Sequence, residues 1–243
     1  MDRSQVDPEE VREKYNGRPE IWDEEDVWHA YTGKKLEEIV CQAVADLALN
    51  EKAVLNVGSA GSTYGLDSEN HFHLDIAERL LPRGGKSVAG SAEALPFLSG
   101  SFDAVICVGS VINYCDAVPV CRETARVLRP GGWLLLEFES SESGEYLWKP
   151  GYSRMVNYVT TSYLGQEERL WLYAPVYLKA LLDASGLIVK DDVGFHVSTV
   201  MAYRLLQNIE RSMNWASLDR FALVRRLLRR FACNRVLLAQ KST

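Results

Sequence analysis

The chain has 243 residues, and 47% of them are hydrophobic, which is enough to bury one sizeable core and predicts a single domain over residues 1–243. Its net charge of −6 and pI near 5.4 argue against a general nucleic-acid-binding surface, which needs a wide basic footprint. No secretory leader pattern and no run of 18 apolar residues is present, so we expect a cytoplasmic protein without stable membrane insertion.

Residues 1–50 are expected to form a helical lead-in that caps the core. The first 25 residues are polar and acid-rich, which is typical of a loose or weakly helical segment. From Val27 to Leu49 apolar residues recur at helical spacing. This stretch therefore predicts an amphipathic helix before the first strand.

Residues 51–140 alternate short apolar strands with connecting segments. Strands are expected at AVLNV, HFHLDI, SVAG, FDAVICVGS and WLLLEFE, and the helix AVPVCRETARVLRPGG ends at Pro130 and the glycine pair. The connection STYGLDSEN has no helical apolar period, so the first crossover helix should be degenerate. The alternation predicts a parallel sheet with right-handed crossovers, in which ligands bind at the carboxyl ends of the strands.

Residues 141–243 are expected to add an acceptor-side lid, a helical insertion and the last strands. PVYLKALLDASG predicts a helix that ends at Gly186, and LIVKDDVGF predicts a strand. A mostly helical excursion from about Met201 to Phe231 then precedes the last strand, RVLLAQ. We interpret this excursion as an insertion within the domain.

The stretch VLNVGSAGSTYGLDSENHFHLDI joins a strand, a glycine turn and a second strand that ends in an acid. Glycine and other small residues in such a turn bring bare main chain close to a ligand. Asp75 comes 19 positions after Asn56 and can accept bonds from both hydroxyls of a ribose. An ordinary tight turn can have the same composition, so the turn alone is weak evidence.

A longer block of sequence strengthens the prediction of a ligand-binding site at this turn. GSAEALPFLSGSFDAVICVGSVINYCDAVPVCRETARVLRPGGWLLLEF resembles the central part of class I S-adenosylmethionine-dependent methyltransferases of type 11, which carry DAxxLPF, FDxV and ExxRVLxPGG in that order. The resemblance covers roughly Ala53 to Phe138. It implies an α/β fold with a Rossmann-like doubly wound seven-stranded, mostly parallel sheet whose last strand is antiparallel, plus N-terminal helices and the helical insertion before the final strand.

The resemblance also implies S-adenosyl-L-methionine as cofactor and suggests which residues hold it. By that resemblance, the glycine turn lies against the methionine part, Asp75 takes the ribose hydroxyls, and Ser91 to Glu93 edge the adenine. The full set implied is Asn56, Gly58, Ser59, Ala60, Gly61, Asp75, Ile76, Ser91, Ala92, Glu93, Val108 and Gly109.

Three of these positions depart from the family pattern. The usual acid of the first motif is Asn56, the usual second glycine is Ala60, and the common aspartate of the third strand is Ser91. These departures and the degenerate first crossover leave open a catalytically inactive, methyltransferase-like binding or regulatory subunit. A nucleotide-dependent oxidoreductase is disfavoured, because it would not explain the LPF and RVLRPGG motifs.

Four side chains are candidates for catalysis. His29 on the leading helix and His196 after the sixth strand could each act as general base, although solvated or hydrogen-bonded core histidines are commoner. Asn113 and Tyr114 follow the fourth strand and are expected to orient the acceptor, with a loop cap as the alternative role of Asn113.

No metal site is expected. Five scattered cysteines never show C-x-x-C spacing, which indicates free thiols in a reducing compartment. His71 and His73 share one face of a strand but lack a third ligand nearby, so surface residues are favoured over a metal pair.

Two C-terminal segments concern partners. The aromatic-rich stretch from Glu139 to Pro175 follows the fifth strand and should contact the acceptor, or else be a lid packed on the core. Between residues 221 and 231, four apolar residues at helical spacing are surrounded by Arg225, Arg226, Arg229 and Arg230. A helix docked by its apolar face is favoured there over one that binds a membrane surface or an anionic ligand.

The sequence therefore predicts a class I methyltransferase that acts on a small-molecule acceptor. The favoured acceptor group is a hydroxyl of a sugar, a glycolipid precursor or a secondary metabolite, because aromatic faces with polar edges suit such rings. No nucleic-acid partner is expected, and a homodimer remains open.

Overall fold

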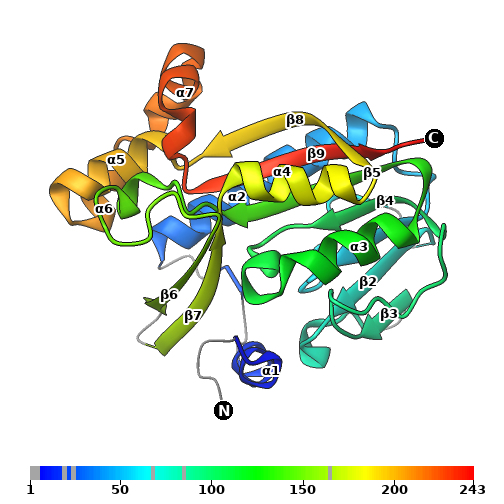
Figure 1. Cartoon of the computed structure of the whole chain (residues 1–243). Helices are drawn as coiled ribbons and strands as arrows, with labels where there is room; N and C mark the ends of the chain where they lie inside the picture. Colours follow the sequence, from blue (N-terminus) through cyan, green and yellow to red (C-terminus); the bar gives the residue numbers. More distant parts are fainter. Residues whose placement is uncertain (1–5, 18–20, 23–25, 67–68, 84–85, 164–165) are drawn as a thin grey trace.

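The computed structural model describes residues 6–17, 21–22, 26–66, 69–83, 86–163 and 166–243. A central sheet carries helices on both faces (Figure 1). The helices are α1 (Pro8–Asn16), α2 (Val27–Asp46), α3 (Ala117–Val127), α4 (Pro175–Ala184), α5 (Val197–Leu206), α6 (Ile209–Met213) and α7 (Ala222–Leu228). The strands are β1 (Val54–Val57), β2 (His71–Asp75), β3 (Lys86–Ala89), β4 (Phe102–Cys107), β5 (Leu128–Glu139), β6 (Val156–Tyr163), β7 (Gln166–Tyr173), β8 (Leu187–Phe195) and β9 (Asn234–Lys241).

The seven-stranded sheet has the order β3-β2-β1-β4-β5-β9-β8. The pairs from β3 to β5 are parallel, whereas β9 runs antiparallel to both β5 and β8. The predicted fold class is confirmed, with the antiparallel last strand lying between β5 and β8. The strand order reverses between β1 and β4, and ligands bind at the carboxyl ends of strands beside such a reversal.

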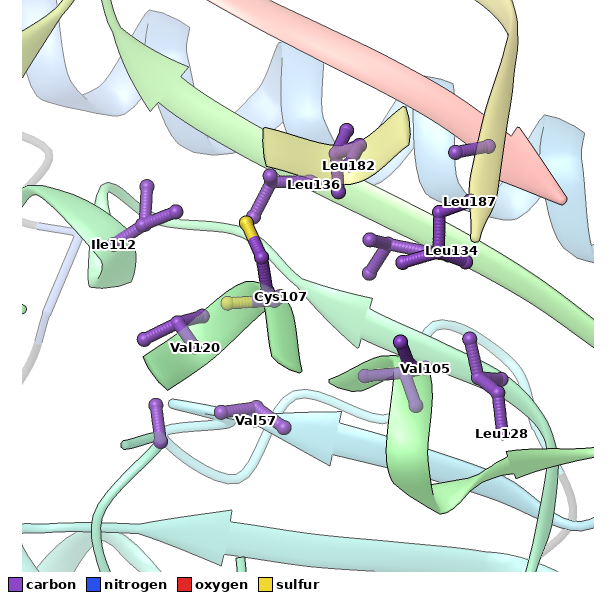
Figure 2. Close-up of a cluster of buried hydrophobic side chains, with 14 of the residues drawn as sticks. Val57, Val105, Cys107, Ile112, Val120, Leu128, Leu134, Leu136, Leu182 and Leu187 are labelled. Carbon is purple, nitrogen blue, oxygen red and sulfur yellow. The ribbon is translucent and has the colours of Figure 1, made fainter. Parts of the chain in front are cut away.

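The central strands are buried on both faces, which explains their near-continuous apolar sequence. In β4, Ala104 and Ile106 pack with α2, whereas Val105 and Cys107 face α3 and α4. Figure 2 shows this second cluster, where strand side chains meet α3 and α4. The residues labelled there are Val57, Val105, Cys107, Ile112, Val120, Leu128, Leu134, Leu136, Leu182 and Leu187.

The connection between β1 and β2 contains no helix in its described residues, 58–66 and 69–70. The predicted degenerate crossover is therefore confirmed for these residues. Tyr64 and Leu66 of this connection pack into the apolar cluster under α2. Two large side chains thus partly cover the face that a crossover helix would otherwise protect.

The described part of the lead-in contains a helix before α2, as the predicted N-terminal helices require. Residues 8–16 form the helix α1, which Asp7 caps by accepting the Glu9 N–H at 2.9 Å, with Pro8 at its first position. Of the two expected alternatives, loose or weakly helical, residues 8–16 adopt the helical one, because the cap and proline signals outweigh the polar composition. Residues 1–5, 18–20 and 23–25 of the predicted lead-in lie outside the described residues.

An unexpected feature is a β-hairpin within the predicted acceptor-side lid. Strands β6 and β7 pair antiparallel as a separate two-stranded sheet. The alternation of residues with a period of two in this stretch is typical of strands, but its many aromatic residues led to its interpretation as a lid. The side chain of Tyr163 lies outside the described residues.

The predicted helical insertion before the final strand is confirmed. It consists of α5, α6 and α7 with the short 3₁₀ helices η4 (Ala216–Arg220) and η5 (Arg229–Phe231). The side chain of Arg225 lies outside the described residues. Among the described helices, none is long and apolar enough to cross a bilayer.

The two histidines of β2 are buried rather than at the surface. His71 is 2% exposed and His73 is 6% exposed, and their ring centroids lie 4.1 Å apart. His71 pairs in register with Val54, so both face the α2 side of the sheet. Burial lowers the pKa of His71 to about 4, with His73 adding to the effect, and burial also lowers the pKa of His73. The surface interpretation of this pair is therefore wrong.

Candidate active site

The first pocket lies at the carboxyl ends of β1, β2 and β4, where the glycine turn follows β1. Gly58 has a φ of +68°, and a Cβ there would lie 2.1 Å from Val111 Cγ2. The N–H groups of Gly58 and Ser59 both donate to the Leu74 carbonyl, at 2.8 and 3.2 Å. Only glycine fits position 58, so the turn presents bare main chain to the pocket.

Asp75 ends β2 at the wall of the same pocket. Its Oδ2 accepts the Ala60 N–H and its Oδ1 accepts the Ala77 N–H, each at 2.9 Å. Burial raises the pKa of Asp75, and these backbone bonds oppose that rise. Each carboxylate oxygen has a further acceptor position, so the group can take bonds from two neighbouring hydroxyls.

Ten of the twelve predicted cofactor residues line this pocket, and two do not. Asn56 is 1% exposed and donates from Nδ2 to the Ser62 carbonyl at 2.9 Å, so it closes the turn from behind. Gly61 has a φ of +81°, and its N–H lies 3.3 Å from Ser59 Oγ. Direct contact of Asn56 and Gly61 with a ligand is thus corrected to a supporting role in the turn.

Residues of the lead-in cover this pocket; the sequence predicted a cap over the core but not which residues would form it. Pro8, Val11 and Tyr15 of α1 line the pocket, together with Ile21 and Trp22. Trp22 packs on Gly33 of α2, where a Cβ would lie 2.7 Å from the indole. A glycine inside a helix is costly, so Gly33 was the signal for this close packing.

A second pocket adjoins the first and shares part of its wall. The shared residues are Tyr15, Ile21, Trp22, Gly109 and Tyr114. Aromatic and acidic side chains from α2 and its N-cap, β5, the 3₁₀ helix η3 (Gly144–Tyr146), β7 and the insertion complete the lining. They include Asp26, Trp28, His29, Glu139, Glu145, Tyr146, Glu168 and Tyr203.

Glu139 is a pocket residue that sequence reasoning missed. It ends β5 and accepts the Ser110 hydroxyl at 3.0 Å, next to the shared residue Gly109. Burial, together with the charges of Glu145 and Glu137, raises the pKa of Glu139 to about 8, against the Ser110 hydrogen bond and the charge of Lys14. Such a carboxyl can gain or lose a proton near neutral pH. In the sequence, two acids at the carboxyl end of an apolar strand, Glu137 and Glu139, could have indicated this residue.

Glu137 supports this region from inside the sheet. It is fully buried and accepts the Gly109 N–H at 3.0 Å and the Ser110 N–H at 2.5 Å through Oε2. Its Oε1 accepts from Asn234 Nδ2 at 2.7 Å. The turn after β4, which both pockets share, is therefore held in place by β5 and β9.

Tyr114 lines both pockets and lies at their boundary. The Tyr15 hydroxyl donates to the Tyr114 hydroxyl at 2.9 Å, and Tyr114 donates in turn to Glu168 of β7. Lys14 Nζ also donates to Glu168. These contacts fasten α1 to the two pockets.

His29 lines the second pocket and is paired with Asp26. Its Nδ1 lies 2.8 Å from Asp26 Oδ2, while Asp26 Oδ1 caps α2 by accepting the N–H groups of Trp28 and His29 at 3.1 and 3.2 Å. The Asp26 carboxylate can accept the Nδ1 proton and so orients the imidazole ring of His29. This arrangement can perform general base chemistry.

His196 and Asn113 do not line either pocket. His196 is fully buried, stacks on Trp28 at 4.0 Å, and has each ring nitrogen within 2.9 Å of a hydroxyl, of Thr32 or of Thr199. Burial lowers its pKa to about 3, with the charge of His29 as a smaller cause. The general-base expectation for His196 is corrected to a core packing role.

Asn113 is also fully buried. Its Nδ2 donates to the carbonyls of Glu139 and Trp171 at 3.1 and 2.6 Å, and its Oδ1 accepts the Glu139 N–H at 2.9 Å. Since all of these bonds are to main chain, Asn113 ties the turn after β4 to β5 and β7. Acceptor orientation by Asn113 is therefore corrected to the structural alternative.

Comparisons with known proteins show which family the chain matches. Residues 49–136 match the family described as a methyltransferase domain. The chain is 33% identical over 151 residues to a demethylmenaquinone methyltransferase of Lactococcus lactis subsp. lactis (strain IL1403). This match covers 53% of this chain and 58% of that protein. It is 30% identical over 201 residues to the demethylmenaquinone methyltransferase of Mycolicibacterium gilvum (strain PYR-GCK), covering 70% of this chain and 84% of that protein.

A solved structure shares the fold over the whole chain. It is the Burkholderia thailandensis 1,6-didemethyltoxoflavin-N1-methyltransferase, solved with bound 1,6-didemethyltoxoflavin and S-adenosylhomocysteine. The TM-score is 0.59 at 14% identity, and the match covers 100% of this chain and 94% of that chain. At this identity the similarity concerns the fold.

Proposed function

Because the chain belongs to the class I S-adenosylmethionine-dependent methyltransferases, we propose that it transfers a methyl group from S-adenosylmethionine to a small acceptor bound in the second pocket. One observation carries the proposal. The pocket with the Gly58 turn and Asp75 shares the wall at Gly109 and Tyr114 with an aromatic and acidic second pocket. Two adjoining pockets suit a reaction between two bound molecules.

The residues of the first pocket fit this cofactor. The Gly58 turn would lie against its amino-acid part, and Asp75 would accept the two ribose hydroxyls. Ser91, Ala92 and Glu93 would edge the adenine. When bound, S-adenosylmethionine supplies a methyl group on a positively charged sulfur atom, which an acceptor atom displaces in line.

The protein's main contribution would be to align the acceptor, an effect that can lower the barrier by about 7–11 kcal/mol. A hydroxyl acceptor holds its proton until it attacks, so a base is also required. His29, oriented by Asp26, and Glu139 are the two proposed proton acceptors of the second pocket. Tyr114 would orient the acceptor through its hydroxyl.

The acceptor we propose carries a hydroxyl on a ring, as in a sugar, a glycolipid precursor or a secondary metabolite. The aromatic walls support this choice, because Trp22, Trp28 and Tyr203 offer flat faces for a ring. An aromatic acceptor suits the same walls, and the relatives described above are named for demethylmenaquinone.

Calorimetry with S-adenosylhomocysteine tests the cofactor site. We expect Asp75→Ala to weaken binding about tenfold or more, since a hydrogen bond to a charged group contributes about 1.5–3 kcal/mol. Asp183→Ala, an exposed acid on α4, is the matched control and should bind as the wild type does. No heat with millimolar ligand, or equal affinities for the two variants, would contradict the proposal.

A methyl-transfer assay separates an active enzyme from an inactive binding subunit. The assay measures S-adenosylhomocysteine release with a panel of hydroxylated sugars, glycolipid precursors and aromatic ring compounds. Turnover with one class names the acceptor. Tight cofactor binding without turnover on any of them would favour the binding subunit.

A further inference from the structure

The helical insertion carries an unusual number of exposed apolar side chains. Seven of them, between residues 205 and 227, are 45% to 83% exposed. We call them the insertion surface: Leu205, Leu206, Ile209, Trp215, Phe221, Leu223 and Leu227. Single exposed apolar residues are normal, but a group on consecutive elements marks a contact surface.

The same segment is strongly basic. Residues 201–231 contain seven arginines and two acids, a surplus of five positive charges, whereas the whole chain carries −6. One of the two acids, Asp219, turns inward and accepts the N–H groups of Val197 and Ser198 at 3.0 and 2.8 Å. Asp219 therefore caps α5 and also lines the groove described next.

The arginines line a groove beside the exposed leucines. Arg220, Arg226, Arg229 and Arg230 all contribute to the wall of this groove, next to Leu227. Neither Arg226 nor Arg230 forms an ion pair with any residue in the described ranges. The carboxylates of Glu38, Asp192 and Asp219 also line this groove, but none of them forms an ion pair with Arg226 or Arg230, so these two arginines can bind an external anion.

The insertion lies at one end of the molecule. Helices α5, α6 and α7 gather beyond the carboxyl end of β8 (Figure 1). Tyr203 of α5 and Ile209 of α6 also line the second pocket. The insertion surface is thus next to the pocket in which the acceptor would bind.

We propose that the insertion surface docks on a lipid bilayer that contains anionic lipids. Its leucines and phenylalanine would enter the boundary between headgroups and acyl chains, while the arginines would bind the lipid phosphates. A second copy of the chain is a poorer occupant. Two identical surfaces packed on each other would bring both arginine groups together, and like charges repel.

Docking has a consequence for the substrate that rests on the proposed function. A pocket beside a membrane-bound surface can receive an acceptor directly from the bilayer. The acceptor would then carry an apolar tail or anchor, with its reactive ring at the headgroup level. Docking itself requires no methyl transfer.

Vesicle flotation tests the proposal. We expect the wild-type protein to float with phosphatidylcholine vesicles that contain about one-third phosphatidylglycerol, and to stay behind with pure phosphatidylcholine. The double variant Leu223→Ser/Leu227→Ser and the double variant Arg226→Gln/Arg230→Gln should each lose about tenfold or more of the binding. The control is Leu98→Ser, an 82% exposed leucine before β4, which should bind as the wild type does.

The outcomes separate docking from the proposed function. All variants should still bind S-adenosylhomocysteine, because none of these residues lines the first pocket. Equal flotation of the wild type and the Leu223→Ser/Leu227→Ser variant, or equal binding to neutral and anionic vesicles, would overturn the proposal. A concentration-dependent dimer in sedimentation, abolished by Leu223→Ser/Leu227→Ser and accompanied by no vesicle binding, would assign the surface to a second copy instead.

Discussion

At the scale of single residues, backbone conformation and burial decide what each site residue can do. Gly58 is required by two independent constraints, a positive φ and the nearby Val111 side chain. Glu139 is ordinary in sequence, but burial beside two other carboxyls changes its acidity. Asn56 takes the place of the family's usual acid and closes the turn through its amide. Each property follows from the surroundings rather than from the residue type.

Gly58→Ala should abolish detectable binding of S-adenosylhomocysteine. The new Cβ would lie 2.1 Å from Val111 Cγ2, so the turn would have to move. Gly100→Ala is the matched control, since Gly100 also has a positive φ, +65°, but no atom lies within 4 Å of a Cβ there. Both variants bear a backbone strain of about 1–2 kcal/mol, and only Gly58→Ala adds the clash. Calorimetry measures the affinities, and partial rescue by Val111→Ala would identify the clash as the cause.

Glu139→Gln should change how stability depends on pH. The folded-state pKa of Glu139 is raised from 4.5 to about 8, so the folded protein holds a proton that the unfolded chain releases. The free energy of unfolding of the wild type therefore falls as pH rises from about 4.5 to about 8. Glu139→Gln lacks this loss and should be more stable than the wild type at pH above about 8, by on the order of a few kcal/mol.

Urea unfolding across this pH range measures the difference between the two proteins. Subtracting the curves removes the contribution of a buried acid that does not interact with Glu139, such as Asp75, because both proteins share it. Exposed Glu51→Gln is the control and should follow the wild type at every pH. Parallel curves for Glu139→Gln and the wild type would show that Glu139 titrates as an ordinary glutamate.

At the scale of elements, the two pockets are completed by segments that are distant in the sequence. Helix α1 covers the first pocket, while the hairpin of β6 and β7 provides Glu168 to hold α1 in place. Helix α1 and the β6–β7 hairpin, which are distant in the sequence, therefore close the first pocket together. Hydrogen bonds from two residues of α1, rather than a large apolar contact, fasten the lid, since α1 has no buried residue.

Loosening α1 should shorten the residence time of the cofactor product. In the double variant Lys14→Met/Tyr15→Phe, the bonds to Glu168 and Tyr114 are lost. Two hydrogen bonds of about 1 kcal/mol each predict a dissociation rate of S-adenosylhomocysteine higher by roughly tenfold or more. Stopped-flow fluorescence of Trp22, which lines the pocket, can follow release. Arg12→Gln on the exposed side of α1 should leave the rate unchanged, and an unchanged rate in the double variant would exclude a lid role.

At the scale of the whole molecule, the strand topology places the first pocket at the carboxyl ends of the strands, and the charge distribution distinguishes the insertion from the rest of the chain. The strand order reverses between β1 and β4, which brings the Gly58 turn, Asp75 and Gly109 together. Outside residues 201–231 the chain carries 31 acids and 20 basic residues, a net charge of −11 against the +5 of the insertion. This separation would orient the protein on an anionic surface, with the insertion toward the lipid and the acidic remainder away from it.

The ordered motifs and the alternation of strands and helices allowed the sequence alone to determine the sheet, the insertion and most of the first pocket. This succeeded because parallel strands buried on both faces need continuous apolar runs, and because a glycine turn can be read locally. Cap and proline signals at Asp7 and Pro8 were available for α1, but they could not show what the helix would cover.

The tertiary structure alone decided the second pocket and the roles of the candidate bases. His29 and His196 have the same chemistry in the sequence, yet one lines a pocket beside Asp26 and the other stacks in the core on Trp28. The pKa of Glu139 likewise depends on Glu145 and Glu137, whose distance from it is set by folding. Desolvation and charge interactions depend on positions in space, so a pattern along the chain determines which elements form but not which side chains become reactive.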